Sequence, residues 1–213
     1  MILRDRSLSF YRIALLVVYD LTVSNAIVIL AAGKSLRFKS SGSKKEDSKL
    51  LVNFKGKPLV SWVLNVVSQV ECDERIVVVK DDSLNYLIEE KFTILKNHTA
   101  ELGLASSLNI GIHYALGEGH SAVTVALADM PFLTVESFVN VIAEDSSPLV
   151  ATSYGQRVAH PIKIKKEMFF KLPTVGDVGA KQLMADFPNM VTLVKGTGSP
   201  VDIDTKEDLD KWS

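Results

Sequence analysis

The segment that follows the first aliphatic stretch of the chain combines small residues with a basic one. Residues 30–37 read LAAGKSLR, so Gly33 follows two alanines and Arg37 comes shortly after it. Small side chains let a backbone approach a ligand closely, and Gly33 is free to adopt positive φ. Successive backbone N–H groups can then cradle phosphate oxygens, to which Arg37 adds a planar fork. This pattern predicts a phosphate-binding loop; the alternative is a tight turn with a solvated arginine.

A second candidate for chemistry is Asp129, which follows the apolar segment 122–128 and precedes Met130 and Pro131. A carboxylate at the end of a strand, opposite a phosphate loop, is well placed to hold Mg²⁺. This ion takes oxygen ligands and bridges the phosphates of nucleotides. The alternative is an aspartate that only caps the turn.

The elements that must position these residues follow from the hydrophobic pattern. Continuous aliphatic runs predict buried strands, and runs with helical spacing predict helices. We expect strands over 26–30, 76–79, 92–95, 122–128 and 149–153, and helices over 59–70, 83–90, 104–116 and 135–143. Pro58 should lie in the first turn of the first helix, and Thr205 with Asp208 fits the N-cap of a final helix.

This alternation favours an α/β fold, a Rossmann-like three-layer sandwich with a mostly parallel sheet. The less regular C-terminal third predicts a small antiparallel addition. In such sheets ligands bind beyond the carboxyl ends of the parallel strands. The glycine-containing loop and Asp129 should therefore share one edge of the sheet.

Two other segments match nucleotide motifs only in part. Gly33-Lys34-Ser35 looks like the end of a Walker A loop, but Val28 stands where that motif needs its first glycine. Residues 117–122, GEGHSA, match a dinucleotide-binding pattern, but they precede a strand instead of following one. Neither segment therefore predicts a nucleotide site by itself.

Composition excludes some classes of function. The 213 residues, 47% of them hydrophobic, suit one globular domain, and the net charge of -1 lacks the basic surplus of a nucleic-acid-binding protein. The single cysteine, Cys72, cannot form an internal disulfide, which favours a reducing, cytoplasmic location.

Residues 1–24 are expected to form a loosely ordered extension before a domain over 25–213. The apolar run 13–19 is broken by Asp20 and is too short to span a bilayer, so no membrane partner is expected. The basic start and short apolar centre resemble a weak signal peptide. Cleavage after Ala26 would trim the first strand, so we favour either a loose tail or a wrongly assigned start of the chain.

An ordered series of motifs between Ala26 and Trp212 resembles the nucleotidyltransferase family that includes molybdenum cofactor cytidylyltransferase. In chain order the matching segments are LAAGKSLRF (30–38), KLL (49–51), GKPL (56–59), Asn97, Gly103, SSL (106–108), ALADMPF (126–132), His160-Pro161, GDVGAK (176–181) and DIDT (202–205). One of these motifs would be a weak signal, but the ordered set is a strong one.

The resemblance implies a Mg²⁺-dependent enzyme that transfers CMP from CTP to the molybdopterin form of the molybdenum cofactor and releases pyrophosphate. It assigns catalysis to Arg37, Lys49 and Asp129. It assigns nucleotide binding to Leu30, Ala31, Ala32, Gly33, Ser35, Arg37, Lys49, Asn97, Gly103 and Ser107. It assigns the acceptor to His160, Asp177 and Lys181, and the metal to Asp129 and Asp202, with Asp204 as the alternative to Asp202.

Some residues depart from the family pattern or have a simpler interpretation. Lys39 replaces a glycine of the family, and the gap before Lys49 is longer than usual, so Lys44 or Lys45 competes for the phosphate role. His160 has a purely structural alternative, a histidine at the end of a strand. Asp177 has another, the cap of a helix that begins near residue 179.

Two other functions remain open. A related transferase could act on a sugar phosphate or methylerythritol phosphate, although methylerythritol enzymes typically have DAARP where this chain has ADMPF. The Ala-Ala-Gly loop and Asp-Met-Pro favour CTP over GTP. A non-catalytic chaperone that holds the molybdenum cofactor is a rival of another class, and a molybdoenzyme or its chaperone is a possible protein partner. Retention of Arg37 and Asp129 favours the enzyme.

Overall fold

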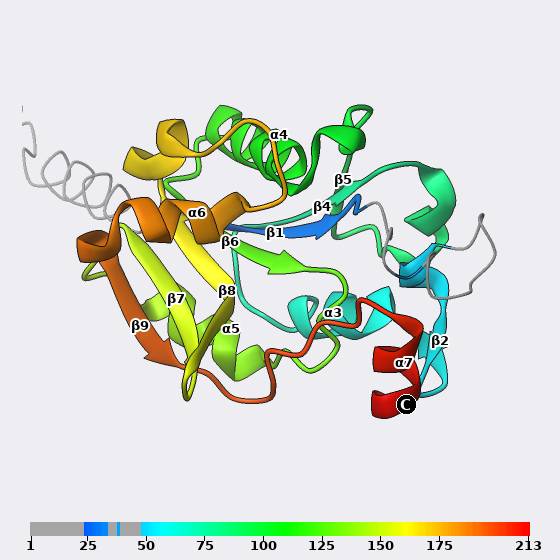
Figure 1. Cartoon of the computed structure of the whole chain (residues 1–213). Coiled ribbons are helices and arrows are strands. Elements are labelled where there is room, and N and C mark those ends of the chain that lie inside the picture. Colours follow the sequence, from blue (N-terminus) through cyan, green and yellow to red (C-terminus); the bar gives the residue numbers. More distant parts are fainter. Residues whose placement is uncertain (1–23, 34–37, 39–47) are drawn as a thin grey trace, which may run out of the picture.

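A seven-stranded sheet with the strand order β5-β4-β1-β6-β8-β7-β9 forms the centre of the computed structural model (Figure 1). The structure describes residues 24–33, 38 and 48–213. Strands β1, β4, β5 and β6 run parallel, β8 runs antiparallel to both of its neighbours, and β9 runs parallel to β7. The strands are β1 (Asn25–Ala31), β4 (Glu74–Val79), β5 (Thr93–Lys96), β6 (Ala122–Leu127), β7 (Leu149–Tyr154), β8 (Arg157–Lys165) and β9 (Val191–Lys195).

Helices cover both faces of this sheet, and a small hairpin lies outside it (Figure 1). Helices α4 and α6 lie on one face and helices α3 and α5 on the other. The helices are α3 (Val60–Val67), α4 (Leu104–Gly117), α5 (Val135–Ala143), α6 (Gly179–Asp186) and α7 (Lys206–Trp212), and the hairpin pairs β2 (Asn53–Phe54) with β3 (Lys57–Pro58). Short 3₁₀ helices are η1 (Lys49–Leu51), η2 (Asp82–Leu87), η3 (Ala100–Leu102), η4 (Lys166–Lys171) and η5 (Pro188–Met190). The predicted three-layer α/β sandwich, with a mostly parallel sheet and an antiparallel addition, is confirmed.

Two hydrophobic cores follow from the alternation of side chains along the strands. In β1, Ala26, Val28 and Leu30 enter the core beneath α4, and the intervening residues enter the core on the α3 side. Every residue of β1 is buried, which explains the continuous aliphatic run. Strand β1 is therefore packed on both faces, which fixes the position of its carboxyl end.

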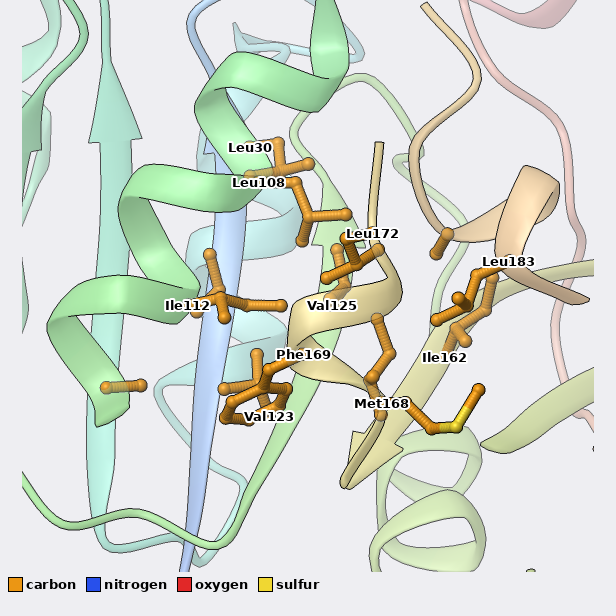
Figure 2. Packing of buried hydrophobic residues seen from close by; sticks show 14 of the residues in the cluster. Leu30, Leu108, Ile112, Val123, Val125, Ile162, Met168, Phe169, Leu172 and Leu183 are labelled. Atoms are coloured by element: carbon orange, nitrogen blue, oxygen red, sulfur yellow. The ribbon is translucent and has the colours of Figure 1, made fainter. Parts of the chain in front are cut away.

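Helix α4 lies unusually close to this strand. Figure 2 shows Leu108 and Ile112 of α4 pointing into the core beside Leu30. A Cβ atom at Gly111 would lie 2.6 Å from Cγ1 of Val28, so only glycine allows this approach. The contact holds the middle of α4 against the middle of β1.

The last helix anchors the C-terminal segment through an aromatic cluster. Ring centroids lie 6.1 Å apart for Phe54 and Trp62, 5.8 Å for Phe54 and Phe132, and 5.6 Å for Phe132 and Trp212. Ile203 is fully buried in this cluster. The predicted N-cap of the final helix is confirmed as a capping box between Thr205 and Asp208.

Some local expectations need correction. Pro58 pairs with Asn53 in the hairpin, and helix α3 begins only at Val60. The segment expected as a helix over 83–90 forms the 3₁₀ helix η2, because the Asp81 side chain accepts a hydrogen bond from the Ser83 N–H and fixes a tight turn.

Strand β8 was missed because Lys163 interrupts its apolar pattern. The Lys163 side chain is buried, and its ammonium group donates to the carbonyl oxygens of Ile142 and Glu144 at the end of α5. These bonds allow a charged residue to lie within a buried strand.

The expected extension, residues 1–24, lies outside the described residues except for Ser24. Within the described part of the chain, no helix is both long enough and apolar enough to cross a membrane.

Candidate active site

A cavity of about 420 Å³ lies at the carboxyl edge of the parallel strands. Its lining is drawn from the ends of β1 and β6, η1, the start of α4, β8, the start of α6 and the segment before α7. The lining residues are Leu30, Ala32, Gly33, Lys49, Leu50, Ala100, Gly103, Leu104, Ser107, Leu127, Ala128, Asp129, His160, Asp177, Val178, Lys181, Asp202 and Asp204. Most of the residues selected from the sequence are therefore gathered in one place.

The two loops that the sequence placed on one edge do lie side by side. Leu30 of β1 is the register partner of Leu127 of β6, so the residues after both strands leave the sheet together. Gly33 and Asp129 both line the cavity. Ala31 does not line it, because its side chain packs into the core on the α3 side. Ser35 and Arg37 lie outside the described residues.

Lys49 occupies the floor of this site. Its backbone begins η1, where the neighbouring Leu50 is buried in the core. The Lys49 ammonium donates to Asp129 Oδ2 and to Asp204 Oδ1, each at 2.7 Å. Its side chain is only 9% exposed. The lysine is therefore held by its backbone and by two carboxylates of the cavity.

The charges of this group are strongly coupled. Burial alone would lower the pKa of Lys49, but attraction and hydrogen bonds from Asp129 and Asp204 outweigh it and raise that pKa. Burial raises the pKa of Asp129, and the positive charge of Lys49 offsets only part of this effect. The carboxylate of Asp129 would thus gain from further positive charge nearby.

One oxygen of Asp129 is left without a partner. Oδ1 is buried and accepts no hydrogen bond within the described structure. Such an atom is costly unless a donor or a cation reaches it, and a carboxylate oxygen is the ligand type that Mg²⁺ prefers. The donor set therefore fits a magnesium ion.

The described residues offer no group of three or more His, Cys, Asp or Glu side chains arranged to hold a metal ion by themselves.

Asp202 and Asp204 reach the cavity because Ile203, which lies between them in the chain, is anchored. The Ile203 N–H donates to the Asp129 carbonyl oxygen at 3.0 Å, while its side chain is buried in the aromatic cluster. Asp202 and Asp204 flank this anchor and both line the cavity. Asp204 shares Lys49 with Asp129, whereas Asp202 lies 3.5 Å from the guanidinium of Arg157.

The start of α4 forms another wall. Ser107 lines the cavity, but Asn97 is fully buried behind it and does not. The Asn97 amide donates to the hydroxyl oxygens of Ser106 and Ser107, at 2.9 and 2.8 Å. Asn97 thus positions Ser107 instead of reaching the cavity itself, and the Ser107 hydroxyl keeps its own proton for donation.

The residues that the resemblance assigned to the acceptor come from β8, from α6 and from the segment before α6; they are His160, Lys181 and Asp177. His160 is buried, and burial together with the positive charge of Lys181 lowers its pKa to about 3. The imidazole is therefore neutral and offers one donor and one acceptor. Lys181 lies in the first turn of α6 and lines the same cavity.

Asp177 does not cap the helix that the sequence suggested. No side chain caps α6; the Asp177 carboxylate instead accepts a hydrogen bond from the Leu104 N–H, at 3.2 Å, at the start of α4. The Gly176 N–H donates to Leu102, and Gly176 accepts from Ala105. This segment therefore joins the start of α6 to the start of α4.

Gly103 permits this junction. Its φ is +97°, and a Cβ there would lie 2.5 Å from both the Gly176 carbonyl oxygen and Asp177 Oδ1. Sequence analysis missed Ala100, Leu104 and Val178 as lining residues, because apolar side chains carry no chemical signal until the fold places them at a cavity.

Gly33, Lys49 and Asp129 thus line one cavity at the carboxyl ends of the parallel strands, which is where ligands bind in α/β folds of this kind. A family model described as the MobA-like NTP transferase domain matches residues 27–191, more than half of the chain. The chain therefore belongs to this family and is a nucleotidyltransferase, which confirms the resemblance drawn from its motifs.

Known proteins agree with this assignment. The purine catabolism protein PucB from Bacillus subtilis (strain 168) is 26% identical over 197 residues, which cover 86% of this chain and 93% of PucB. The crystal structure of a homologue of Mycobacterium tuberculosis Rv0371c, from Mycobacterium sp. strain JC1, superposes with a TM-score of 0.74. It is 19% identical, covering 90% of this chain and 96% of that one.

Two further structures share the fold. Rv0371c from M. tuberculosis H37Rv in complex with manganese has a TM-score of 0.65 and 18% identity, over 89% of this chain and 97% of that one. An inositol-1-phosphate CTP transferase from T. maritima has a TM-score of 0.67 and 14% identity, over 88% and 92%. Divalent metal use is typical of the family.

Proposed function

We propose that this nucleotidyltransferase transfers CMP from CTP to the molybdopterin form of the molybdenum cofactor, with Mg²⁺, and releases pyrophosphate. The observation that carries the proposal is the cavity in which Gly33, Lys49 and Asp129 face His160 and Lys181. It offers a nucleotide side and an acceptor side within one space. The reaction is placed in the cytoplasm, in keeping with the single cysteine.

The reaction would be an in-line attack by an acceptor phosphate oxygen on the α-phosphorus. The backbone around Gly33, with Ser35 and Arg37, would hold the triphosphate, and Lys49 would neutralise charge at the α-phosphate. Ser107 would donate to the base or ribose. Catalysis then comes from positioning and charge neutralisation, so no protein nucleophile is needed.

Asp129 would hold the metal ion together with a second carboxylate. Magnesium, when bound, would neutralise charge on the phosphates. The sequence favoured Asp202 as the second ligand. Geometry supports Asp204, because it shares a cation with Asp129, while Asp202 lies beside Arg157.

On the acceptor side, Lys181 would attract the acceptor phosphate. The neutral His160 would contact a polar, uncharged group, because its imidazole carries no positive charge at physiological pH. Asp177 would shape this wall through its contact with Leu104.

The choice of CTP is supported by the Ala31-Ala32-Gly33 loop and by Asp129-Met130-Pro131, which favour the cytidylyl branch of the family. A second candidate acceptor is a phosphorylated polyol such as methylerythritol phosphate or inositol phosphate. The fold neighbour named as an inositol-1-phosphate CTP transferase favours this alternative.

The test is pyrophosphate release with each of the four ribonucleoside triphosphates, with and without molybdopterin, in the presence of Mg²⁺. We expect release that requires both CTP and molybdopterin. Release with inositol phosphate or methylerythritol phosphate, and none with molybdopterin, would replace the proposed acceptor. No release under any condition, with the cofactor bound tightly, would favour a chaperone.

A further inference from the structure

The floor of the cavity contains one cation held by two carboxylates. The Lys49 ammonium lies 2.7 Å from Asp129 Oδ2 and 2.7 Å from Asp204 Oδ1, and these residues come from three separate parts of the chain. All three line the cavity. A positive charge therefore already occupies the space between the carboxylates.

Asp129 and Asp204 are poorly suited to bind the Lys49 ammonium and a metal ion at the same time. A divalent ion bound to the same carboxylates would lie close to the ammonium, and two like charges in a poorly solvated site repel strongly. An ammonium held by Asp129 and Asp204 is also not directed at a phosphate. The observed ion pairs and a loaded metal site are thus alternatives for the same oxygens.

We propose that Lys49 is a positioning residue that holds the metal position closed until a triphosphate arrives. Without nucleotide, its ammonium neutralises Asp129 and Asp204 and keeps a metal ion from binding alone. A bound triphosphate supplies new anionic partners for Lys49, so the carboxylates are released to the metal that accompanies the nucleotide. This inference rests on the proposed function of the cavity.

The local structure suits such an exchange. The backbone of Lys49 is fixed by the buried Leu50, so only the side chain needs to move. A lysine side chain has a flexible four-carbon stem and a compact charge. In return, the partly buried carboxylate of Asp129 is never left without a cation, a state that would be strongly unfavourable.

The experiment measures Mn²⁺ binding by the full chain, from the electron paramagnetic resonance signal of free Mn²⁺, without nucleotide at pH 8. Wild type is compared with Lys49→Met and Lys49→Gln, which remove the charge and keep a side chain of similar length. Lys57→Met is the matched control, because Lys57 stacks on Trp62 in the hairpin and does not line the cavity. Circular dichroism confirms that each variant is folded, and Lys49→Gln serves if Lys49→Met is not.

We expect at least tenfold tighter Mn²⁺ binding by the Lys49 variants, and unchanged binding by Lys57→Met. A non-hydrolysable CTP analogue should then tighten Mn²⁺ binding more in wild type than in the variants. Equal affinities of wild type and Lys49 variants without nucleotide would overturn the inference, even if the analogue promotes Mn²⁺ binding normally. If the analogue promotes no Mn²⁺ binding by any form, the proposed function itself fails, and the inference with it.

Discussion

Two polar clusters lie at opposite ends of the parallel strands, one at their amino ends and one at their carboxyl ends. At the amino edge, His120 Nε2 lies 2.9 Å from Glu74 Oε2, its Nδ1 lies 2.7 Å from the Ser24 hydroxyl, and Thr93 donates to Glu74 Oε1 at 2.7 Å. At the carboxyl edge, Lys49 joins two aspartates, and Asp129 Oδ1 has no partner among the described residues.

The two clusters differ in whether all of their polar side-chain atoms have hydrogen-bond partners. Both oxygens of Glu74 and both ring nitrogens of His120 are bonded. Burial would raise the pKa of Glu74, but hydrogen bonds from His120, Thr93 and Tyr114 outweigh it and lower that pKa. Neither Glu74 nor His120 lines the cavity.

This comparison separates a structural network from a functional one. A buried network whose members are all bonded stabilises a fold, whereas an orphaned buried oxygen beside a cavity calls for a ligand. Composition alone would not distinguish them, because each contains acidic side chains and a basic one.

The largest effect should come from Asp129→Asn. The change removes a charged metal ligand, which contributes several kcal/mol to the transition state, so turnover should fall by roughly a thousandfold or more. The fold should survive. Initial rates of pyrophosphate release at saturating Mg²⁺, together with a thermal melt, check this; a well-folded variant with near-normal turnover would refute the role of Asp129.

Next comes Lys49→Ala, compared with Lys44→Ala and Lys45→Ala. Lys49 is anchored beside the buried Leu50, so ordering its side chain costs little entropy. Its loss should cut turnover roughly a hundredfold, equivalent to about 3 kcal/mol. Steady-state rates of the three variants decide the matter, since equal and small losses would show that the phosphate lysine was misplaced.

The amino-edge cluster should behave in the opposite way. Glu74→Gln removes a charged hydrogen-bond partner of His120 and should lower the free energy of unfolding by about 1 to 3 kcal/mol. Turnover at a temperature where the variant is folded should stay close to that of wild type. Urea unfolding measures the free energy of unfolding, and pyrophosphate release measures turnover. A loss of turnover without a loss of stability would show that the Glu74 cluster takes part in catalysis.

A further effect concerns acid stability. The pKa of His160 is about 3 in the folded protein against an ordinary 6.5. As pH falls from 6.5 toward 3, His160 binds a proton in the unfolded chain but not in the folded protein. The free energy of unfolding therefore falls by up to about 1.4 kcal/mol per pH unit.

His160→Gln should remove this part of the pH dependence of the unfolding free energy. His113→Gln, at an exposed position on α4, is the matched control and should keep the wild-type slope. Identical slopes for all three proteins between pH 6 and pH 4 would mean that His160 is not buried as a neutral imidazole.

Much of the fold could be predicted from the sequence because β1, β4 and β6 are rich in buried aliphatic residues, with only Thr124 inside the run of β6. Strand β8 was missed because Lys163 breaks its pattern, and the carbonyls that satisfy its ammonium come from a distant helix. A short apolar run predicts a buried strand from the sequence alone. A charged residue within a buried strand is explained only by the tertiary contacts that satisfy its charge.

The same limit applies to the candidate site. Motifs indicated Asp129 and Lys49, but their ion pair joins residues far apart in the chain, and no spacing predicts it. Asn97 and Asp177 were expected at the ligands. Asn97 is buried behind Ser107 and does not line the cavity, whereas Asp177 lines it and also accepts a hydrogen bond from the Leu104 N–H. These contacts depend on the packing of α4, which the sequence does not show.

The most direct test of this account is to locate the bound nucleotide and metal. Mn²⁺ with CTP, added in small amounts to the isotope-labelled protein, broadens the NMR signals of nearby backbone amides. The account predicts that the amides of Gly33 and Asp129 broaden first, while those of Glu74 and His120 remain sharp. Broadening centred on Glu74 and His120, or none at Asp129, would contradict it.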